Sequence, residues 1–183
     1  MEHHDSSRTL ALTGIRCRPE EVDEVVTELF ARLHVPVRRY VRAIVGSDQD
    51  AQDVTQEAFI RLHAALKAGQ SIDRVRGWLF RIAHNCAIDL RRRQGVLAAD
   101  EEIGVVELED LAPDAEERLL MRERHRHVLA GLAWLSPQER RCLALRAAGL
   151  NYREIGEVLN LRVSSVATFV MRGIKKITRA LDG

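Results

Sequence analysis

Hydrophobic residues recur at three- and four-residue intervals over most of the chain, which is the spacing of amphipathic helices. The first stripe starts near residue 20 and is carried by Val22, Val25, Val26, Leu29 and Leu33. Because proline lacks the amide hydrogen that a helix needs, Pro36 is expected to kink or break this helix before it resumes over residues 37–45. Gly46 is expected to end it.

Two further helices are expected in the first half of the chain. Ser47 is a suitable N-cap for a helix over residues 48–67, whose first turn is acidic and so complements the helix dipole. A polar loop with Gly69 separates it from a third helix over residues 75–93. That helix ends in three consecutive arginines and carries Trp78 on its apolar stripe, where packing in the core is favoured over a stacking role at the surface.

The second half begins with a segment that predicts no regular element. Residues 96–115 are acidic, aperiodic and interrupted by Gly104 and Pro113, as is typical of a linker. Helical spacing returns over residues 115–135. The run 136–139 combines an N-cap serine, a proline at the first helical position and a capping-box Glu139, so a new helix is expected there and should end at Gly149.

Residues 150–172 have the layout of a helix-turn-helix. Gly156 is small where a second helix must cross closely, and Asn160 stands where the turn needs a positive φ. Leu161 and Val163 are expected to plug the turn, and Ser164 and Ser165 to cap the second helix. Its buried stripe is expected to comprise Val166, Val170, Ile174 and Ile177.

The opposite face of this second helix is polar and basic. Such a helix fits the major groove, with its first residues near base edges and its later cations near phosphates. An ordinary helical hairpin with a solvated basic face would share this polarity, but the capped start, the small residue and the turn favour DNA binding.

Charge is segregated along the chain, although the net charge is only +1. Residues 1–94 carry 15 Lys/Arg against 13 Asp/Glu, residues 95–118 carry one against nine, and residues 119–183 carry 12 against five. A basic C-terminal segment that follows an acidic segment indicates separate binding partners, one of them polyanionic. Hydrophobic residues at 46% and aromatics at 4% fit an all-α fold of one or two small domains.

Several classes of function are disfavoured. Cys17, Cys86 and Cys142 form no disulfide or zinc pattern, and no histidine pair has a recognised ligand spacing, since His125 and His127 point in different directions on a helix. We therefore expect no metal, no cofactor and no catalysis. The absence of a long apolar run or a signal layout predicts a cytoplasmic protein with no membrane insertion.

The runs 50–62 (DAQDVTQEAFIRL), 77–93 (GWLFRIAHNCAIDLRRR) and 135–176 together resemble the extracytoplasmic-function sigma factors, the smallest members of the sigma-70 family. The resemblance implies two small helical domains: region 2 over residues 19–95 and region 4 over residues 116–183. An acidic linker over residues 96–115 would join them, and residues 1–18 are expected to be disordered. The implied function is to direct RNA polymerase to promoters and assist promoter melting.

The resemblance assigns roles to three sets of residues. Polymerase binding, at the β′ clamp helices, falls to Asp53, Gln56, Glu57 and Ile60, which share a helix face. Recognition of the −10 element, with an unpaired base held beside the loop at 67–74, falls to Arg76, Arg81, Asn85, Arg91 and Arg92. Recognition of the −35 element falls to Arg153, Ser164, Ser165, Thr168, Phe169, Arg172, Lys175 and Lys176.

The implied partners are core RNA polymerase, through its β′ and β subunits, promoter DNA and, as in many relatives, an anti-sigma factor. The linker would enter the RNA-exit channel or serve only as a solubilising tether. Ala167 and Phe169 replace the family's usual basic residues, so no −35 sequence preference is transferred. A helix-turn-helix regulator that binds duplex DNA without polymerase is the alternative, although it leaves the run 50–62 unexplained.

Overall fold

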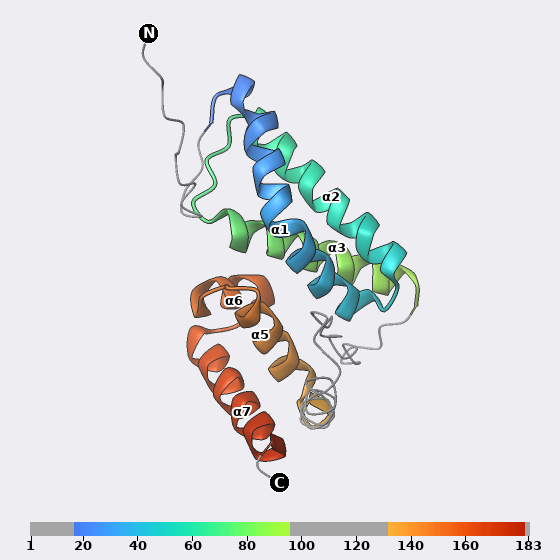
Figure 1. Cartoon of the computed structure of the whole chain (residues 1–183), viewed down its shortest axis with the longest axis vertical. Coiled ribbons are helices and arrows are strands. Elements are labelled where there is room, and N and C mark those ends of the chain that lie inside the picture. Colours follow the sequence, from blue (N-terminus) through green and yellow to red (C-terminus); the bar gives the residue numbers. More distant parts are fainter. Residues whose placement is uncertain (1–16, 96–131, 182–183) are drawn as a thin grey trace, which may run out of the picture.

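The computed structural model describes residues 17–95 and 132–181, and both parts are helical, as the sequence predicts (Figure 1). The first part contains the short 3-10 helix η1 (Pro19–Glu21) and the helices α1 (Val22–Val45), α2 (Asp48–Lys67) and α3 (Val75–Arg93). The second contains α5 (Pro137–Ala147), α6 (Tyr152–Leu159) and α7 (Val163–Leu181). The predicted acidic linker, and most of the helix expected over 115–135, lie outside the described residues. No described helix is long and apolar enough to cross a membrane.

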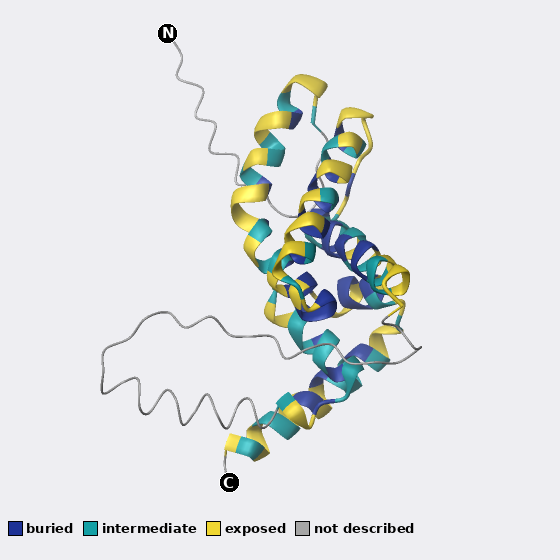
Figure 2. Cartoon of the chain, turned by 90° about the vertical axis from the view of Figure 1, so that its right-hand side faces the viewer, coloured by how far each residue is buried: buried dark blue, intermediate teal, exposed yellow. Residues whose placement is uncertain are grey.

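Helices α1, α2 and α3 form a three-helix bundle whose inner faces are buried (Figure 2). Leu29, Leu33, Leu62, Leu79 and Phe80 are at most 1% exposed. Burying a side chain of this size contributes about 1.5–3 kcal/mol, so these five are a large part of the stability of the bundle. The boundaries of α2 and α3 coincide with those predicted from the sequence.

The expected break at Pro36 is absent, because α1 runs without interruption from Val22 to Val45. Buried residues on both sides of the proline, Leu33 and Val37 among them, pack into the same core. Contacts of α1 with both α2 and α3 therefore hold the two halves in one helix. The predicted end at Gly46 is confirmed, since this glycine adopts φ 79°.

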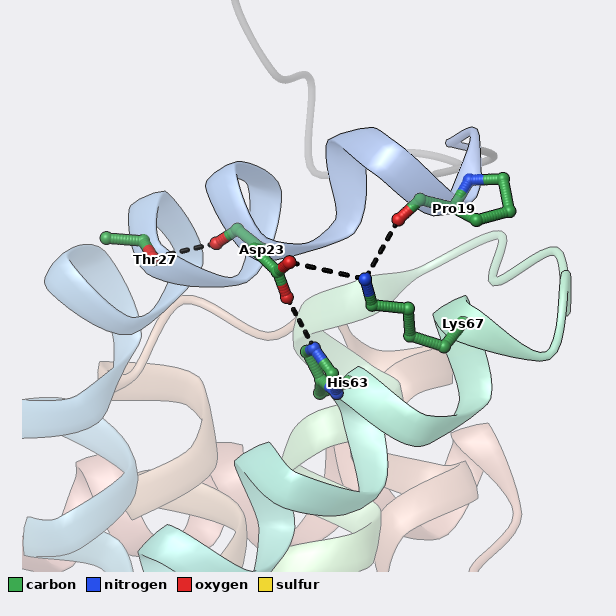
Figure 3. Close-up of polar contacts among 5 residues, drawn as sticks. All are labelled: Pro19, Asp23, Thr27, His63 and Lys67. Atoms are coloured by element: carbon green, nitrogen blue, oxygen red, sulfur yellow. Dashed lines mark hydrogen bonds and ion pairs between the residues drawn. The ribbon is translucent and has the colours of Figure 1, made fainter.

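Polar contacts fasten the start of α1 to the end of α2 (Figure 3). Asp23 accepts hydrogen bonds from His63 Nε2 at 2.7 Å and Lys67 Nζ at 3.2 Å, and Lys67 also donates to the Pro19 carbonyl at 3.0 Å. The hydrogen bonds from His63 and Lys67 hold the pKa of the Asp23 carboxyl below its usual value. Because these side chains are well exposed, the cluster positions η1 more than it stabilises the bundle.

In the second part, α5 begins with the predicted capping box. Glu139 N donates to Ser136 Oγ at 3.3 Å, and Ser136 N donates to Glu139 Oε2 at 2.8 Å. The same carboxylate, although buried, pairs with Lys176 Nζ of α7 at 2.7 Å. Burial opposes its ionisation, but Lys176 and the Ser136 amide outweigh that effect and keep the pKa of Glu139 below its usual value.

The two parts share one continuous hydrophobic core, which includes residues of α1 to α3 together with Cys142, Leu145 and Leu150. Near this junction the hydroxyl oxygen of Tyr40 on α1 lies 3.0 Å from Nδ1 of His84 on α3. Burial, and then the nearby guanidinium of Arg141 on α5, lower the pKa of His84 from 6.5 to about 4. The imidazole is therefore neutral at pH 7, and its Nδ1 is hydrogen-bonded to the Tyr40 hydroxyl.

The neutral state of His84 leads to a testable pH dependence. Below pH 6.5 His84 binds a proton in the unfolded chain, whereas in the folded chain it stays neutral down to about pH 4. Stability is therefore expected to fall by about 3 kcal/mol as the pH drops from 6.5 to 4. His84→Gln retains an acceptor for Tyr40 but does not titrate, so its urea-unfolding free energy should lack this component. Parallel pH profiles of the two proteins would contradict the assignment.

Candidate nucleic-acid and polymerase interface

The predicted stripe on α2 forms an exposed face of mixed polarity. Asp53 and Gln56 are exposed, Glu57 is half-buried and Ile60 is 57% exposed. Neighbours along the same helix orient the two carboxylates: Gln49 Nε2 donates to Asp53 at 3.1 Å, and Arg61 Nε donates to Glu57 at 2.7 Å. An apolar side chain among fixed acids can dock on a basic, partly apolar surface.

An aromatic residue of α1, not selected from the sequence, adds to this part of the surface. Phe30 is 43% exposed. Its ring stacks on that of His34, with 4.7 Å between the ring centroids. It also makes an edge contact with Phe59, the residue before Ile60, with 4.9 Å between the centroids. The sequence could have indicated Phe30, because this residue follows Leu29 and does not share the helical spacing of the buried residues of α1. A large aromatic off its stripe is a candidate for an intermolecular contact.

A pocket of about 150 Å³ lies at the start of α3. Its lining comes from the preceding loop, from α3 and from α6, and comprises Ser71, Ile72, Asp73, Arg74, Gly77, Trp78, Arg81 and Glu157. Trp78 is half-buried: it packs against the core, as predicted, and also lines this pocket. An indole and two guanidinium groups around one hollow can stack on a base and hold its phosphate.

The five predicted −10 residues do not share one environment. Arg81 and Asn85 are exposed one helical turn apart. Arg92 is exposed, and its Nη1 lies 3.8 Å from Asp89 Oδ1. Arg91 is half-buried with its Nε enclosed. Arg76 faces the second part of the chain instead, since its Nη1 donates to the Ala148 carbonyl at 3.3 Å.

Helices α6 and α7 form the predicted helix-turn-helix. Asn151 caps α6 by accepting from Glu154 N at 3.0 Å, and Asn160 ends it with φ 53°. The predicted close approach at Gly156 is present, because a Cβ there would lie 2.7 Å from the Leu161 carbonyl oxygen and 4.0 Å from Val166 of α7. The turn is therefore packed tightly enough to set the direction of α7.

Three details of α7 differ from the prediction. The helix begins at Val163, so Ser164 and Ser165 lie in its first turn rather than at its cap, and Val163 is 49% exposed instead of plugging the turn. Ile174 is 52% exposed, and Gly173 takes its place on the buried stripe. Periodicity alone did not separate these neighbours, because both lie near the edge of the stripe.

Most of the predicted −35 residues lie on accessible surface of this unit. Arg153, Ser164, Arg172 and Lys175 are exposed, while Ser165, Thr168 and Phe169 are half-buried. Lys176 is the exception, because its ammonium group pairs with the buried Glu139 and so holds α7 against α5. Arg162, exposed just before α7, was missed; a cation at the start of a recognition helix was the available signal.

Among the residues that the structure describes, no group of His, Cys, Asp and Glu side chains could hold a metal ion.

Comparison with known proteins matches both helical units to one family. Residues 29–96 match Sigma-70 region 2, and residues 127–177 match Sigma-70, region 4.

Individual relatives span both units. The ECF RNA polymerase sigma factor SigE of Mycolicibacterium smegmatis is 30% identical over 169 residues, which cover 90% of this chain and 63% of that protein. The RNA polymerase sigma-H factor of Pseudomonas aeruginosa is 30% identical over 147 residues, covering 75% of this chain and 76% of that one. The solved structure of CnrH in complex with the cytosolic domain of CnrY has the same fold, with a TM-score of 0.56 at 24% identity over 90% of this chain and 94% of CnrH.

Proposed function

The chain belongs to the sigma-70 family, in its extracytoplasmic-function class, and we propose that it is a non-catalytic initiation subunit that binds core RNA polymerase and directs it to a set of promoters. The observation that carries this proposal is the presence, in one chain, of an exposed face of acidic and apolar residues on α2 and a helix-turn-helix. A duplex-binding regulator would need only the second of these.

Polymerase docking is assigned to the α2 face around Asp53, Glu57 and Ile60. Its acids are held in place by Gln49 and Arg61, and its apolar centre is exposed, a combination suited to a basic helical partner such as the clamp helices of the β′ subunit. Phe30, against Phe59, is the proposed apolar extension of this face on α1.

Recognition of the −10 element is assigned to the pocket at the start of α3. An unpaired base would stack beside Trp78, with Arg74 and Arg81 close enough to hold the phosphates. Capturing a base outside the helix offsets part of the cost of unpairing it, so binding and strand opening are coupled. Asn85 and Arg92, exposed further along α3, would extend the contact to neighbouring nucleotides.

Recognition of the −35 element is assigned to the exposed face of α7 and its approach. Arg162, Ser164 and Ser165 lie at the start of the helix, where a major-groove reader meets base edges, and Phe169 can contact a thymine methyl group. Arg172 and Lys175 follow on the same helix and are proposed to contact phosphates. An anti-sigma factor is a further proposed partner, as the solved CnrH structure contains the cytosolic domain of CnrY.

Reconstitution tests the function directly. The purified chain is mixed with core RNA polymerase, and run-off transcription is measured on fragments of genomic DNA. A stable complex that initiates at discrete promoters is expected. Binding of the chain to duplex DNA without any association with core polymerase would show that it is a regulator instead.

The salt dependence of promoter binding tests the phosphate contacts on α7. Each phosphate contact adds about 0.9 to the slope of log affinity against log salt, so Arg172→Ala with Lys175→Ala should reduce that slope by about 2. The measurement is a salt titration of holoenzyme binding to a promoter found by run-off transcription. Lys176→Ala is the matched control: it should lower the unfolding temperature, because it leaves Glu139 buried without its cation, yet keep the slope. An unchanged slope in the double variant would place the phosphate contacts elsewhere.

A further inference from the structure

The proposed recognition helix α7 is held against α5 at two successive turns (Figure 1). At the first, Gly173 is buried, and a Cβ there would lie 2.6 Å from Leu143 Cδ1 and 3.5 Å from Leu135 Cδ2. At the second, one turn further along, Lys176 Nζ lies 2.7 Å from Glu139 Oε2. The first contact limits how closely the helices approach, but apolar contacts are not directional. The polar contact is therefore the one that can fix how α7 is rotated on α5.

The acceptor of this polar contact, the Glu139 carboxylate, is itself held in place. Glu139 is 4% exposed and closes the capping box at the start of α5 together with Ser136. Its Oε2 accepts hydrogen bonds both from the Ser136 amide at 2.8 Å and from Lys176 Nζ at 2.7 Å. One carboxylate oxygen thus joins the N-terminus of α5 to the C-terminal half of α7.

Lys176 lies on the same face of α7 as residues assigned to the −35 element. Arg172, Phe169 and Ser165 precede it by four, seven and eleven residues, which is the spacing of a single helix face. Because α7 is one continuous helix, these eleven residues span about 16 Å, and a rotation fixed at Lys176 is fixed along that whole length. Anchoring Lys176 therefore orients the side chains that are proposed to meet the bases.

The ion pair is better suited to specifying this orientation than to adding stability. The Glu139 side chain is 5% exposed and that of Lys176 is 39% exposed, so both groups give up contact with water to form the pair. Replacing a buried ion pair by uncharged groups of similar size is often neutral or stabilising, whereas removing one partner leaves a charge uncompensated. A charge-assisted hydrogen bond also has a preferred geometry. Orientation and stability can therefore be separated by experiment.

We propose that Glu139 is a positioning residue for recognition of the −35 element: through Lys176 it fixes the rotation of α7 and so the presentation of its base-reading face. This inference rests on the proposed function, since it requires α7 to read the −35 element. Neither member of the pair touches DNA. Lys176, which the family resemblance assigns to DNA, contributes to recognition through α5 instead.

The test removes the ion pair without leaving a buried charge. Glu139→Gln keeps an oxygen for the capping box, and Lys176→Met keeps the apolar stem of the side chain without its ammonium group. The double variant is expected to unfold at a temperature close to that of the wild type. Its holoenzyme should nevertheless discriminate at least about fivefold less between a promoter from the run-off screen and the same promoter with a scrambled −35 element. Competitive promoter binding measures this ratio, and unchanged discrimination would overturn the proposal.

Single variants separate positioning from stability. Lys176→Met alone leaves the Glu139 carboxylate buried without a cation, so it should lower both the unfolding temperature and the discrimination. Adding Glu139→Gln should restore the temperature but not the discrimination. Lys176→Arg retains a charged donor and should keep at least about half of the discrimination. If discrimination recovers together with the unfolding temperature, the pair acts on stability alone and the proposal is wrong.

A matched control removes an exposed ion pair elsewhere in the chain. Arg32 Nη2 lies 3.0 Å from Glu28 Oε1 on α1, and these side chains are 50% and 42% exposed. Glu28→Gln with Arg32→Met removes one charge of each sign, as the test variant does, and should leave the discrimination at the wild-type value. An equal loss in this control would assign the effect to overall charge and contradict the proposal.

Hydrogen exchange of the free protein gives a readout that needs no polymerase. Without the anchor, amides in the C-terminal half of α7 are expected to exchange at least about threefold faster in the double variant, at equal global stability. Equal protection would show that the pair does not restrain α7 and would also overturn the proposal. If the wild-type holoenzyme prefers no −35 element, the proposed function itself is wrong, and the exchange rates still report whether the pair holds α7 in place.

Discussion

Replacing both Asp53 and Glu57 by lysine is expected to abolish binding to core RNA polymerase, with a loss of at least about a hundredfold in affinity. Reversing two charges on a face that docks on a basic partner turns attraction into repulsion, and like-charge juxtaposition at an interface costs several kcal/mol. The measurement is a titration of labelled chain with core polymerase, followed by fluorescence anisotropy. The isosteric pair Asp53→Asn and Glu57→Gln should weaken binding less, because it removes attraction without adding repulsion.

The fold should survive this charge reversal. Asp53 and Glu57 interact only with Gln49 and Arg61 in the hydrogen bonds and ion pairs of the described residues, and exposed pairs of this kind contribute about 1 kcal/mol or less. Glu20→Lys with Glu24→Lys reverses the same number of charges on η1 and α1 and should leave polymerase binding intact. Equal losses in the two double variants would mean that overall charge, rather than the α2 face, controls the association.

Gly156→Ala is expected to destabilise region 4 by about 2 kcal/mol or more and to lower promoter-specific transcription at least tenfold. The added Cβ would lie 2.7 Å from the Leu161 carbonyl oxygen. That oxygen belongs to the turn, which is itself held by the hydrogen bond from Leu161 N to the Gly156 carbonyl at 2.9 Å, so relief requires moving the backbone. Displacing the turn redirects α7, the proposed recognition helix. Urea unfolding and run-off transcription measure the two effects.

Gly173→Ala is the matched control for the change at Gly156. A Cβ there would meet Leu143 Cδ1 at 2.6 Å, which is the end of a side chain that can change rotamer. Alanine also favours a helix interior over glycine by about 1 kcal/mol, which offsets part of the repacking cost. We expect unfolding and transcription close to wild type. Similar damage from both substitutions would remove the special role assigned to the turn.

Much of the fold could be predicted because local signals agreed with one another. The limits of α2 and α3, the capping box at Ser136 and Glu139, and the positive φ of Asn160 all follow from residue types that have few alternatives in those places. The break considered at Pro36 does not occur, because tertiary packing outweighed a local preference. Its helix is buried on both sides of the proline, and that burial exceeds the cost of one missing hydrogen bond.

The candidate site was predictable only as far as single helix faces are concerned. The α2 stripe follows from spacing, but whether a cation is available depends on what lies opposite it. Lys176 was expected to meet DNA and instead neutralises a buried carboxylate 37 residues earlier in the chain, and Arg76 binds a carbonyl 72 residues later. No periodicity encodes such pairings, because they arise only when the helices pack.

The two polar contacts between α3 and region 4 differ in kind, and this difference has a consequence for variation at their positions. Arg76 binds a main-chain carbonyl, which every residue at position 148 supplies, whereas Arg74 binds the side chain of Glu157. A saturation scan should accordingly find intolerance at Arg76 with nothing reciprocal at Ala148. Compensating exchanges should arise at Arg74 and Glu157. Only this pair can therefore show correlated substitutions among descendants of this protein.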